Sequence, residues 1–380
     1  MEWKECQIKD VCRLINGRAY SNGEMLEHGK YKIVRVGNLS GGNSTWFYSD
    51  LELPEDKYCH NGDLLFAWAC TFGPHIWKED NTIFHYHIWK IVEDKNVVDR
   101  RFYYYYLKYA TGGFLGALNG SVMVHITKAS MEKMNIKIPK NLDDQRRIAS
   151  ILSSLDRKIE LNNKINADLE EMAQAIFKNW FVDFEPFKDG KFVDSELGMI
   201  PEGWKIGSLG DFCNVFTGKK NTNQAIEKGL YPFFSCAPEP LASNDAIFNG
   251  KAIIIAGNGS YTGRTSFYNG GFDLYQRTYA CTIREQDKEN LMIFFYHMMK
   301  QFFEPTKMGG TRGSSIPYIV MGDITQQKFP YSEDWLIRFS NIANSMMDRK
   351  LRIDKENSRL SLLRDTLLPR LMSGEIEVPE

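Results

Sequence analysis

The sequence repeats one plan twice, and this repetition limits the possible folds more than any other feature. Similar residues recur in the same order along both halves. The aligned pairs are Trp3-Lys4 with Trp204-Lys205, Gly17-Arg18 with Gly218-Lys219, Phe102-Tyr103-Tyr104 with Phe294-Phe295-Tyr296, and Asp156-Arg157-Lys158 with Asp348-Arg349-Lys350. Ordered matches over most of a chain indicate an internal duplication. The alternative is a pair of unrelated domains that contain similar strands.

Each copy begins with a stretch that is rich in predicted β-structure. Asn-Gly dipeptides favour tight turns with positive φ, and all of them fall within residues 1–141 and 204–331. Charged and aromatic residues that run on without Gly or Pro predict a short helix near 99–111 and another near 289–303. We therefore expect an α+β fold with two globular domains, each β-rich with short helices.

After each globular stretch, apolar residues follow the three- and four-residue spacing of a coiled coil. This spacing predicts long helices at 142–182 and 332–375, with residues 183–203 as the linker. The seam residues are Leu155, Ile159, Asn162, Asn166, Leu169 and Ile176 in the first helix, and Ile353, Asn357, Leu360, Leu363 and Leu367 in the second. A buried Asn fixes the register of a helix pair, so we expect the two helices to pack antiparallel.

Charge and composition restrict the class of protein. The net charge is −1, which argues against a protein that coats nucleic acid by electrostatics alone. The two globular stretches each carry a small excess of Lys and Arg, while the remaining segments are acidic. This asymmetry is compatible with globular domains that face phosphate and connecting segments that face a protein partner, or with chance variation of the surface.

Location and metal binding can also be judged from composition. We find no apolar stretch long enough for a membrane span and no signal-peptide pattern at the N-terminus, so we expect a cytoplasmic protein. The seven cysteines are scattered without a Cys-x-x-Cys pair. His85 and His87 share one strand face, but without further ligands nearby they are interpreted as ordinary sheet residues. We expect no metal site.

Catalytic motifs are missing from the sequence. There is no Gly-x4-Gly-Lys-Ser/Thr phosphate loop, no Gly-x-Gly-x-x-Gly turn and no Gly-x-Ser-x-Gly elbow. The Asn/Asp-Pro-Pro-aromatic tetrapeptide that DNA amino-methyltransferases use to hold a flipped base is also missing. We therefore expect no catalytic residues and no cofactor bound by this chain.

Two Gly-rich polar loops in each copy are the candidate DNA-binding elements. Glycines let the backbone approach a surface closely, while Arg, Asn, Ser and Thr bond phosphates and base edges. The candidates are Arg18, Trp68, Thr71, His75, Asn119 and Ser121 in the first copy, and Lys219, Lys220, Asn258, Ser260, Tyr261, Thr262, Arg264, Thr311, Arg312, Ser314 and Ser315 in the second. Arg264 and Arg312 suit guanine recognition, while Lys219 and Lys220 suit phosphate contact. Glycine loops are also common as plain connections between strands.

Three short phrases and the duplicated layout carry a family resemblance. The phrases are Ile200-Pro201-Glu202-Gly203-Trp204, Gln145-Arg146-Arg147-Ile148-Ala149 and Leu368-Pro369-Arg370-Leu371. With them the chain resembles the specificity subunit of a Type I restriction-modification system over nearly its whole length. One departure is Ser332-Glu333-Asp334-Trp335, which stands where the second helix would begin with a glutamine-containing phrase.

The resemblance implies two target recognition domains, each reading one half of a split, asymmetric double-stranded DNA target. It implies that residues 145–181 and 335–373 set the gap between the half-sites and dock two methyltransferase subunits. S-adenosylmethionine would be bound by those subunits, and ATP with Mg²⁺ by restriction subunits that can join. Two other readings remain open: a self-sufficient DNA methyltransferase or nuclease with a disguised site, and a coiled-coil adaptor whose domains bind peptides or glycans.

Overall fold

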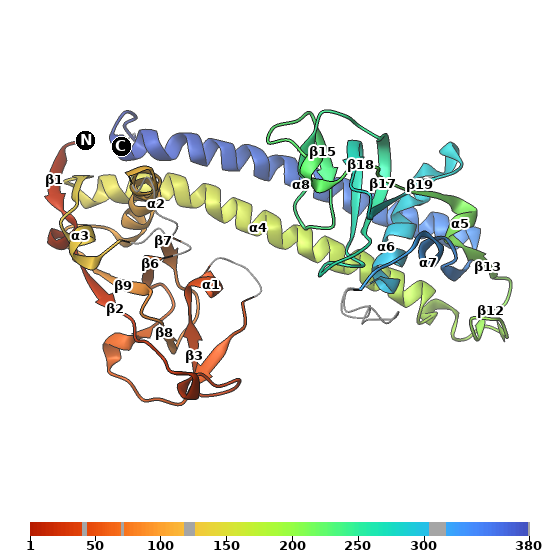
Figure 1. Cartoon of the computed structure of the whole chain (residues 1–380), viewed down its shortest axis with the longest axis horizontal. Coiled ribbons are helices and arrows are strands. Elements are labelled where there is room, and N and C mark those ends of the chain that lie inside the picture. The colour runs from red at the N-terminus through yellow and green to blue at the C-terminus, as the bar shows by residue number, and fades with distance from the viewer. Residues whose placement is uncertain (40–43, 70–71, 118–125, 304–316, 379–380) are drawn as a thin grey trace. The chain divides into compact units, whose positions relative to one another are not determined.

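The structure is a computed structural model that describes residues 1–39, 44–69, 72–117, 126–303 and 317–378 (Figure 1). The chain divides into two compact units. Unit 1 comprises Met1–Leu161 and Glu356–Glu380, and unit 2 comprises Asn162–Lys355. Among the described residues, no helix combines the length and the apolar character that crossing a membrane requires.

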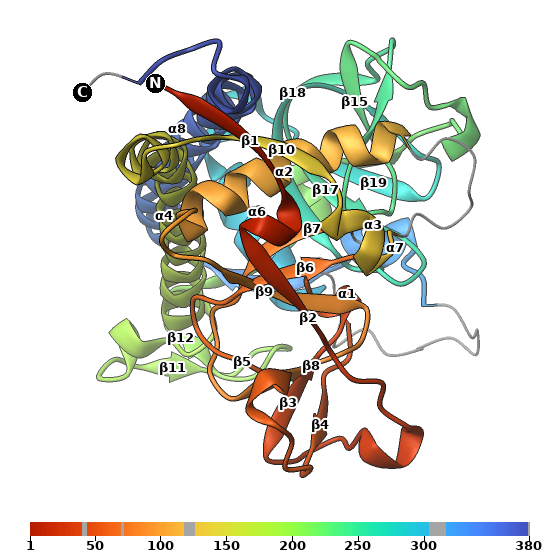
Figure 2. The same cartoon turned by 90° about the vertical axis from the view of Figure 1, so that its left-hand side faces the viewer.

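In its described residues, unit 1 contains three small sheets and short helices around an aromatic core. A two-stranded sheet pairs β1 (Trp3–Gln7) with β10 (Asn135–Pro139), which lie side by side in Figure 2. One four-stranded sheet has the order β2 (Cys12–Asn16), β9 (Ile88–Glu93), β6 (Leu64–Ala67), β7 (Gly73–Ile76). The other has the order β4 (Phe47–Ser49), β3 (Tyr31–Val34), β8 (Thr82–Phe84), β5 (Tyr58–Cys59).

The helices of unit 1 cover these sheets. They are α1 (Val36–Leu39), α2 (Arg100–Ala117) and α3 (Lys128–Glu132), with 3-10 turns η1 (Ile8–Asp10), η2 (Asn22–Glu24) and η3 (Glu55–Lys57). Phe102 and Tyr103 of α2 are fully buried against Phe66 and Trp89 of the sheet. Burial of such large rings contributes on the order of 2–3 kcal/mol each, so α2 anchors the domain core.

Unit 2 repeats this plan with one larger sheet. β13 (Lys205–Ser208) pairs with β20 (Lys328–Tyr331). The six-stranded sheet has the order β14 (Cys213–Thr217), β19 (Thr278–Ile283), β17 (Phe248–Ala256), β18 (Thr265–Leu274), β15 (Tyr231–Phe234), β16 (Leu241–Ser243). The helices are α5 (Leu209–Phe212), α6 (Met292–Phe302) and α7 (Met321–Thr325), with η5 (Thr222–Gln224) and η6 (Gln286–Leu291). The linker contains η4 (Glu185–Phe187), β11 (Phe192–Val193) and β12 (Ile200–Pro201).

Strand pairing confirms the α+β class and the internal duplication. The antiparallel pair β1 and β10 corresponds to β13 and β20, and the parallel pair β3 and β8 corresponds to β15 and β18. An isolated parallel bridge joins Arg18 to His85 in unit 1 and Lys220 to Tyr275 in unit 2. Equivalent pairings between segments far apart in sequence are a stronger sign of duplication than local similarity.

The main difference between the copies lies in one strand pair, since unit 2 has the long strands β17 and β18 where unit 1 has β5 with β6 and β7 with β8. In unit 1 the residues between β7 and β8 include Asn81 at a φ of 54°, and the sheet is interrupted there. In unit 2 the single strand β18 continues through this place, because Gly250 and Gly270 face each other across β17 and β18 at φ of 143° and 147°. Such dihedrals are accessible to glycine and let the paired strands bend without ending.

The two long helices are α4 (Leu142–Phe181) and α8 (Glu333–Ser373), and each contributes to both units. In unit 1 Arg364 contacts Asp156 at 2.8 Å, and in unit 2 the Asn166 amide donates to Asp354 at 2.6 Å. Residue numbers rise along one helix as they fall along the other, so the helices pack antiparallel. Every predicted seam residue is buried or half-buried except Leu363, which is exposed.

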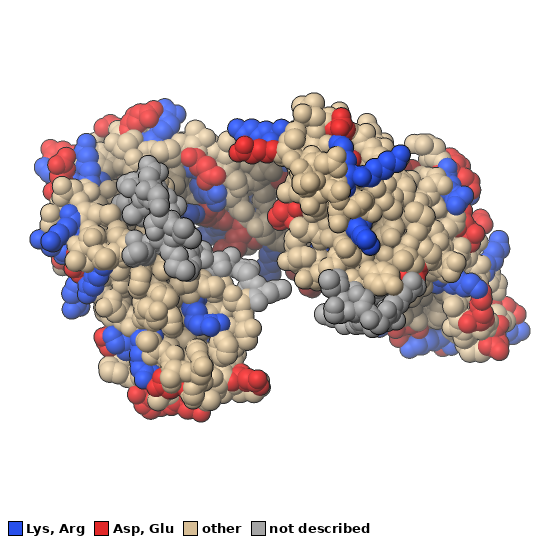
Figure 3. Space-filling view, in the orientation of Figure 1, with Lys and Arg blue, Asp and Glu red and all other residues tan. Residues whose placement is uncertain are grey.

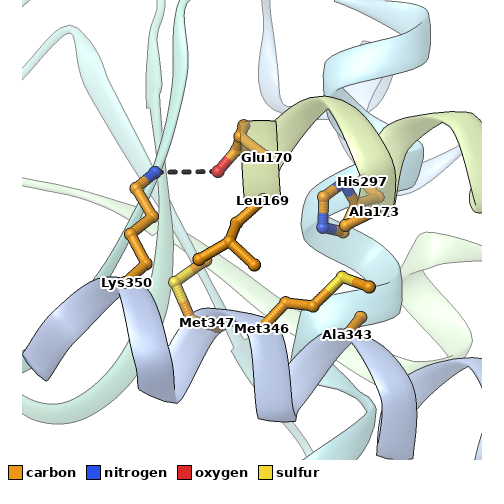
Figure 4. A pocket seen from close by; sticks show the side chains of 8 residues that line it. All are labelled: Leu169, Glu170, Ala173, His297, Ala343, Met346, Met347 and Lys350. Atoms are coloured by element: carbon orange, nitrogen blue, oxygen red, sulfur yellow. Dashed lines mark hydrogen bonds and ion pairs between the residues drawn. The ribbon is translucent and has the colours of Figure 1, made fainter. Parts of the chain in front are cut away.

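A half-buried carboxylate joins three helices in unit 2. Glu170 of α4 accepts hydrogen bonds from Tyr296 and Lys300 of α6 at 2.7 and 2.8 Å. It also accepts from Lys350 of α8 at 2.7 Å (Figure 4). Burial opposes ionisation, but the two ammonium groups lower the pKa of Glu170 to about 2. The cavity beside it measures about 10 Å³, which is room for at most one water. The cluster is therefore a structural joint.

We predict that Glu170→Gln lowers the free energy of unfolding of unit 2 by about 1–3 kcal/mol at pH 7, because two half-buried ammonium groups lose their counter-charge. The folded pKa lies below the value of 4.5 for an unperturbed Glu. This stabilisation is therefore present above pH 4.5 and is lost as the pH falls toward 2. Urea unfolding at pH 7 and pH 3 would measure the effect.

The matched control is Glu171→Gln, since Glu171 is exposed on the same helix. An equal effect of both substitutions, or a difference between wild type and Glu170→Gln that does not shrink at pH 3, would contradict this assignment.

Candidate nucleic-acid interface

In unit 2 the structure joins the first Gly-rich loop to the residues that follow the second. Ile319 donates its backbone N–H to the Gly257 carbonyl at 2.8 Å, and Asn258 forms a bridge with Tyr318. The Thr262 hydroxyl donates to Pro317 at 2.9 Å. Thr311, Arg312, Ser314 and Ser315 lie outside the described residues, so their contact with DNA stays a prediction.

The exposed tip of this first loop is small. Ser260 and Tyr261 are exposed, and the Tyr261 ring is available for contact with a base or sugar. Thr262 is buried, and its hydroxyl is bonded within the protein. Asn258 is half-buried, and its side-chain oxygen lies 3.1 Å from the Cys236 sulfur. Ser260 and Tyr261 are therefore the loop residues that the geometry presents to a ligand.

In unit 1 the equivalent position is held by Trp68. Its backbone carbonyl accepts from Ile126 at 3.4 Å, as Gly257 accepts from Ile319 in unit 2. Thr71, Asn119 and Ser121 lie outside the described residues. His75 is half-buried in β7 opposite Leu65. Burial and, to a smaller extent, Lys108 lower the pKa of His75, so its ring is neutral at pH 7.

Three of the predicted cationic side chains have partners within their own unit. Arg18 forms an ion pair with Glu24 at 2.5 Å. Lys220 lies 2.6 Å from Asp273 and 2.7 Å from Asp245. The Arg264 guanidinium donates to the backbone carbonyls of residues 237 and 238. These contacts give all three side chains a role in holding loops.

Lys219 is the remaining predicted cation in the described part of unit 2, and it is exposed. The alignment of Arg18 with Lys219 is corrected by the backbone. The Arg18 carbonyl accepts from Tyr86, and the Lys220 carbonyl accepts from Gln276, both at 3.0 Å. Arg18 and Lys220 are thus equivalent, because the second copy has one additional residue, Lys219, between its Gly and the bridging residue.

Charged side chains do not gather into one patch on the visible face. In Figure 3, Lys and Arg are scattered over the described surface of each unit. No group of three His, Cys, Asp or Glu among the described residues is arranged to hold a metal ion. A surface of this kind suits recognition by shape and specific contacts more than by net charge.

The two units attach to their long helices by different chemistry. Gln145, the fourth residue of α4, is fully buried; its amide donates to Pro139 at 2.8 Å and to Val97 at 3.1 Å, and its carbonyl accepts from Asp99 at 2.8 Å. The fourth residue of α8 is Leu336, which is buried in the apolar core. The departure at Ser332-Glu333-Asp334-Trp335 therefore replaces a polar clamp with apolar packing.

An open groove remains beside Leu336 in unit 2. Its volume is about 230 Å³, and Phe212, Leu291 and Ile337 contribute to its lining. Ile337 is 46% exposed. The apolar joint of unit 2 is therefore partly open to solvent.

Comparisons with known proteins agree with the duplication. A family model described as "Type I restriction modification DNA specificity domain" matches residues 1–171 and, separately, residues 201–332. The specificity subunit of the Type I restriction enzyme MjaIX from Methanocaldococcus jannaschii is 27% identical over 312 residues, covering 76% of this chain and 72% of that protein. The HindI specificity subunit from Haemophilus influenzae is 24% identical over 479 residues, covering 99% of this chain and 100% of that protein.

A solved structure shares the fold. The crystal structure of a Type-I restriction-modification system S subunit from M. genitalium aligns with a TM-score of 0.60 at 17% identity. The alignment covers 98% of this chain and 96% of that chain.

We predict that Gln145→Leu destabilises unit 1 by about 1–3 kcal/mol, because it leaves the backbone groups of Val97, Asp99 and Pro139 buried without partners. Thermal unfolding followed by circular dichroism would measure this. Ser150→Leu, at an exposed position of the same helix, is the control and should change stability by less than about 0.5 kcal/mol. A neutral Gln145→Leu would show that the polar clamp is dispensable.

Proposed function

From the premise that this chain belongs to the Type I restriction modification DNA specificity family and is a specificity subunit, we propose that it reads a split, asymmetric double-stranded DNA target. Each globular domain reads one half of the target. The observation that carries this proposal is that the family model matches the two repeated halves separately. Two readers in one chain recognise a longer site than either alone.

The loops support two different half-sites. The backbone framework is equivalent in both units, but the side chains at the candidate interface differ. Trp68 stands where unit 2 has Gly257, and exposed Lys219 has no cationic equivalent beside Arg18. DNA sequence is read through side-chain contacts to base edges. Because the two domains share a backbone but differ in these side chains, we expect them to recognise two different half-site sequences.

Exposed apolar side chains on the long helices support docking of protein partners. In unit 1 these are Leu161 of α4 and Leu362 of α8, which are 52% and 70% exposed. In unit 2 they are Met172 of α4 and Ile342 of α8, which are 52% and 38% exposed. Apolar side chains of this size on exposed helix faces favour a protein contact.

We assign these faces to two methyltransferase subunits. S-adenosylmethionine is then bound by those partners, and ATP with Mg²⁺ by restriction subunits that can join. The chain itself binds double-stranded DNA and performs no chemistry. Partner subunits also supply part of the phosphate neutralisation that a chain with a net charge of −1 does not provide.

We predict that the purified chain alone transfers no methyl group, and that sequence-specific methylation arises when its methyltransferase partner is added. Sequencing of methylated bases in DNA exposed to the complex would show one bipartite motif with two different halves. Turnover by the chain alone would support the self-sufficient enzyme instead. Selection from random duplexes that enriches no split motif would support the adaptor.

We predict that the helices set the gap between the half-sites. Deleting residues 159–165 and 355–361 together removes seven residues from each helix and keeps the coiled-coil phase. The loss is about 10 Å of helix at ~1.5 Å per residue, so the gap should shorten by about three base pairs at ~3.4 Å each. A seven-residue insertion at the same places is the control and should lengthen the gap equally. An unchanged gap in both variants would show that the length of the helices does not set the gap between the half-sites.

A further inference from the structure

A third element reaches the candidate interface in both units, in addition to the two Gly-rich loops. It is a tight turn of three residues, 85–87 after β8 and 275–277 after β18, which we name the crossover turn. It contains neither Gly nor Pro, so no residue in it predicts a turn. His85 and His87 were interpreted as ordinary sheet residues, but the structure places them in this turn.

The backbone of the crossover turn is held by the same hydrogen bonds in both units. In unit 1 Ile88 donates to His85 at 3.0 Å, and Trp68 donates to His87 at 3.1 Å. In unit 2 Thr278 donates to Tyr275 at 3.0 Å, and Gly257 donates to Arg277 at 2.9 Å. The turns therefore project their side chains from equivalent places.

The crossover turn is joined through one residue to the described residue that follows the second loop. The backbone N–H groups of Trp68 and Gly257 donate to the turn. Their backbone carbonyls accept from Ile126 and Ile319, which follow the second loop in each unit. Tyr86 is 40% exposed, and Gln276 and Arg277 are exposed. The turn is thus exposed next to the described part of the candidate interface.

The side chains of the two turns have different chemistry. In unit 1 the Trp68 ring lies 5.0 Å from His87 and 6.2 Å from Tyr86, between ring centroids. The Trp68 indole N–H donates to the Tyr86 carbonyl at 2.9 Å, which fixes this aromatic cluster. Such a surface suits stacking and contact with the thymine methyl group.

In unit 2 the turn is polar and partly pre-oriented. The Gln276 amide donates to the Asn221 side chain at 2.6 Å, which orients the amide plane and leaves its carbonyl oxygen free of that bond. Arg277 extends next to it with its backbone carbonyl fixed by Gly257. Glutamine pairs with adenine N6 and N7, and arginine with guanine O6 and N7, each through two hydrogen bonds.

We propose that the crossover turns read bases, with Arg277 contacting a guanine and Gln276 an adenine in the second half-site, and with Tyr86 and His87 contacting the first half-site through their rings. This inference rests on the proposed function, since it names the residues through which each domain reads its half. It adds a reading element that is distinct from the Gly-rich loops.

The test uses the complex of the full chain with its methyltransferase partner, and it maps methylated sites on genomic DNA. Arg277→Ala should lower the discrimination at one guanine of one half-site by about ten- to hundredfold, as expected for a lost bidentate contact. The other half-site should be unchanged. Lys228→Ala is the matched control, since it removes an exposed positive charge from another loop of the same domain and should leave the motif intact.

A transplant provides the converse test. The double substitution Tyr86→Gln and His87→Arg places the second turn's side chains on the equivalent backbone of unit 1. It should change the preferred bases in the first half-site alone and add a guanine requirement there. Retained circular dichroism and retained salt-dependent binding to random DNA show that each variant is folded.

The outcomes separate the inference from the function on which it rests. A wild-type complex that methylates no split motif overturns the proposed function. A wild-type split motif that Arg277→Ala leaves unchanged overturns the crossover turn alone. A uniform loss of affinity for all sequences in Arg277→Ala assigns Arg277 to phosphate and also overturns base reading. Relaxation at one guanine in one half-site supports the inference.

Discussion

The packing of each globular domain on the two long helices is the constraint on which the rest of the structure depends. In each unit one carboxylate of α4 joins the short helix of the domain to α8. In unit 1 Asp156 accepts from Tyr105 and Arg364, and in unit 2 Glu170 accepts from Tyr296 and Lys350. A charge that is partly removed from water is tolerated only when its partners are placed well, so these contacts fix the register of three helices.

The repeated framework and the long helices could be predicted from the sequence, because both leave regular traces. The spacing of Leu155, Ile159 and Asn162 reflects helix geometry alone, and it needs no knowledge of distant residues. The order of similar phrases in the two halves likewise survives changes in individual side chains. The α+β class followed from these two observations, and the strand pairing agrees with it.

The detail of the candidate interface could not be predicted, because it depends on pairs of groups far apart in sequence. Arg264 donates hydrogen bonds to the backbone carbonyls of residues 237 and 238. Lys220 forms ion pairs with Asp245 and Asp273. Nothing near Arg264 or Lys220 in the sequence indicates these partners. Charge type alone therefore could not separate the cations that hold loops from those, such as Lys219, that remain exposed. The crossover turn could not be predicted for a related reason. Long-range backbone hydrogen bonds hold it, and it contains no Gly or Pro that would indicate a turn.

The joint of each domain determines how freely its sequence can change. Gln145 must satisfy two carbonyls and one N–H of fixed direction, so a change there requires a compensating rearrangement of three backbone groups at once. The Leu336 side chain packs in the apolar core, where contacts have no preferred direction, and other apolar side chains of similar volume can replace it at little cost. The two copies thus differ in how well they tolerate substitution where the globular domain meets the long helix. A different globular domain could be joined at the second position with fewer compensating substitutions than at the first.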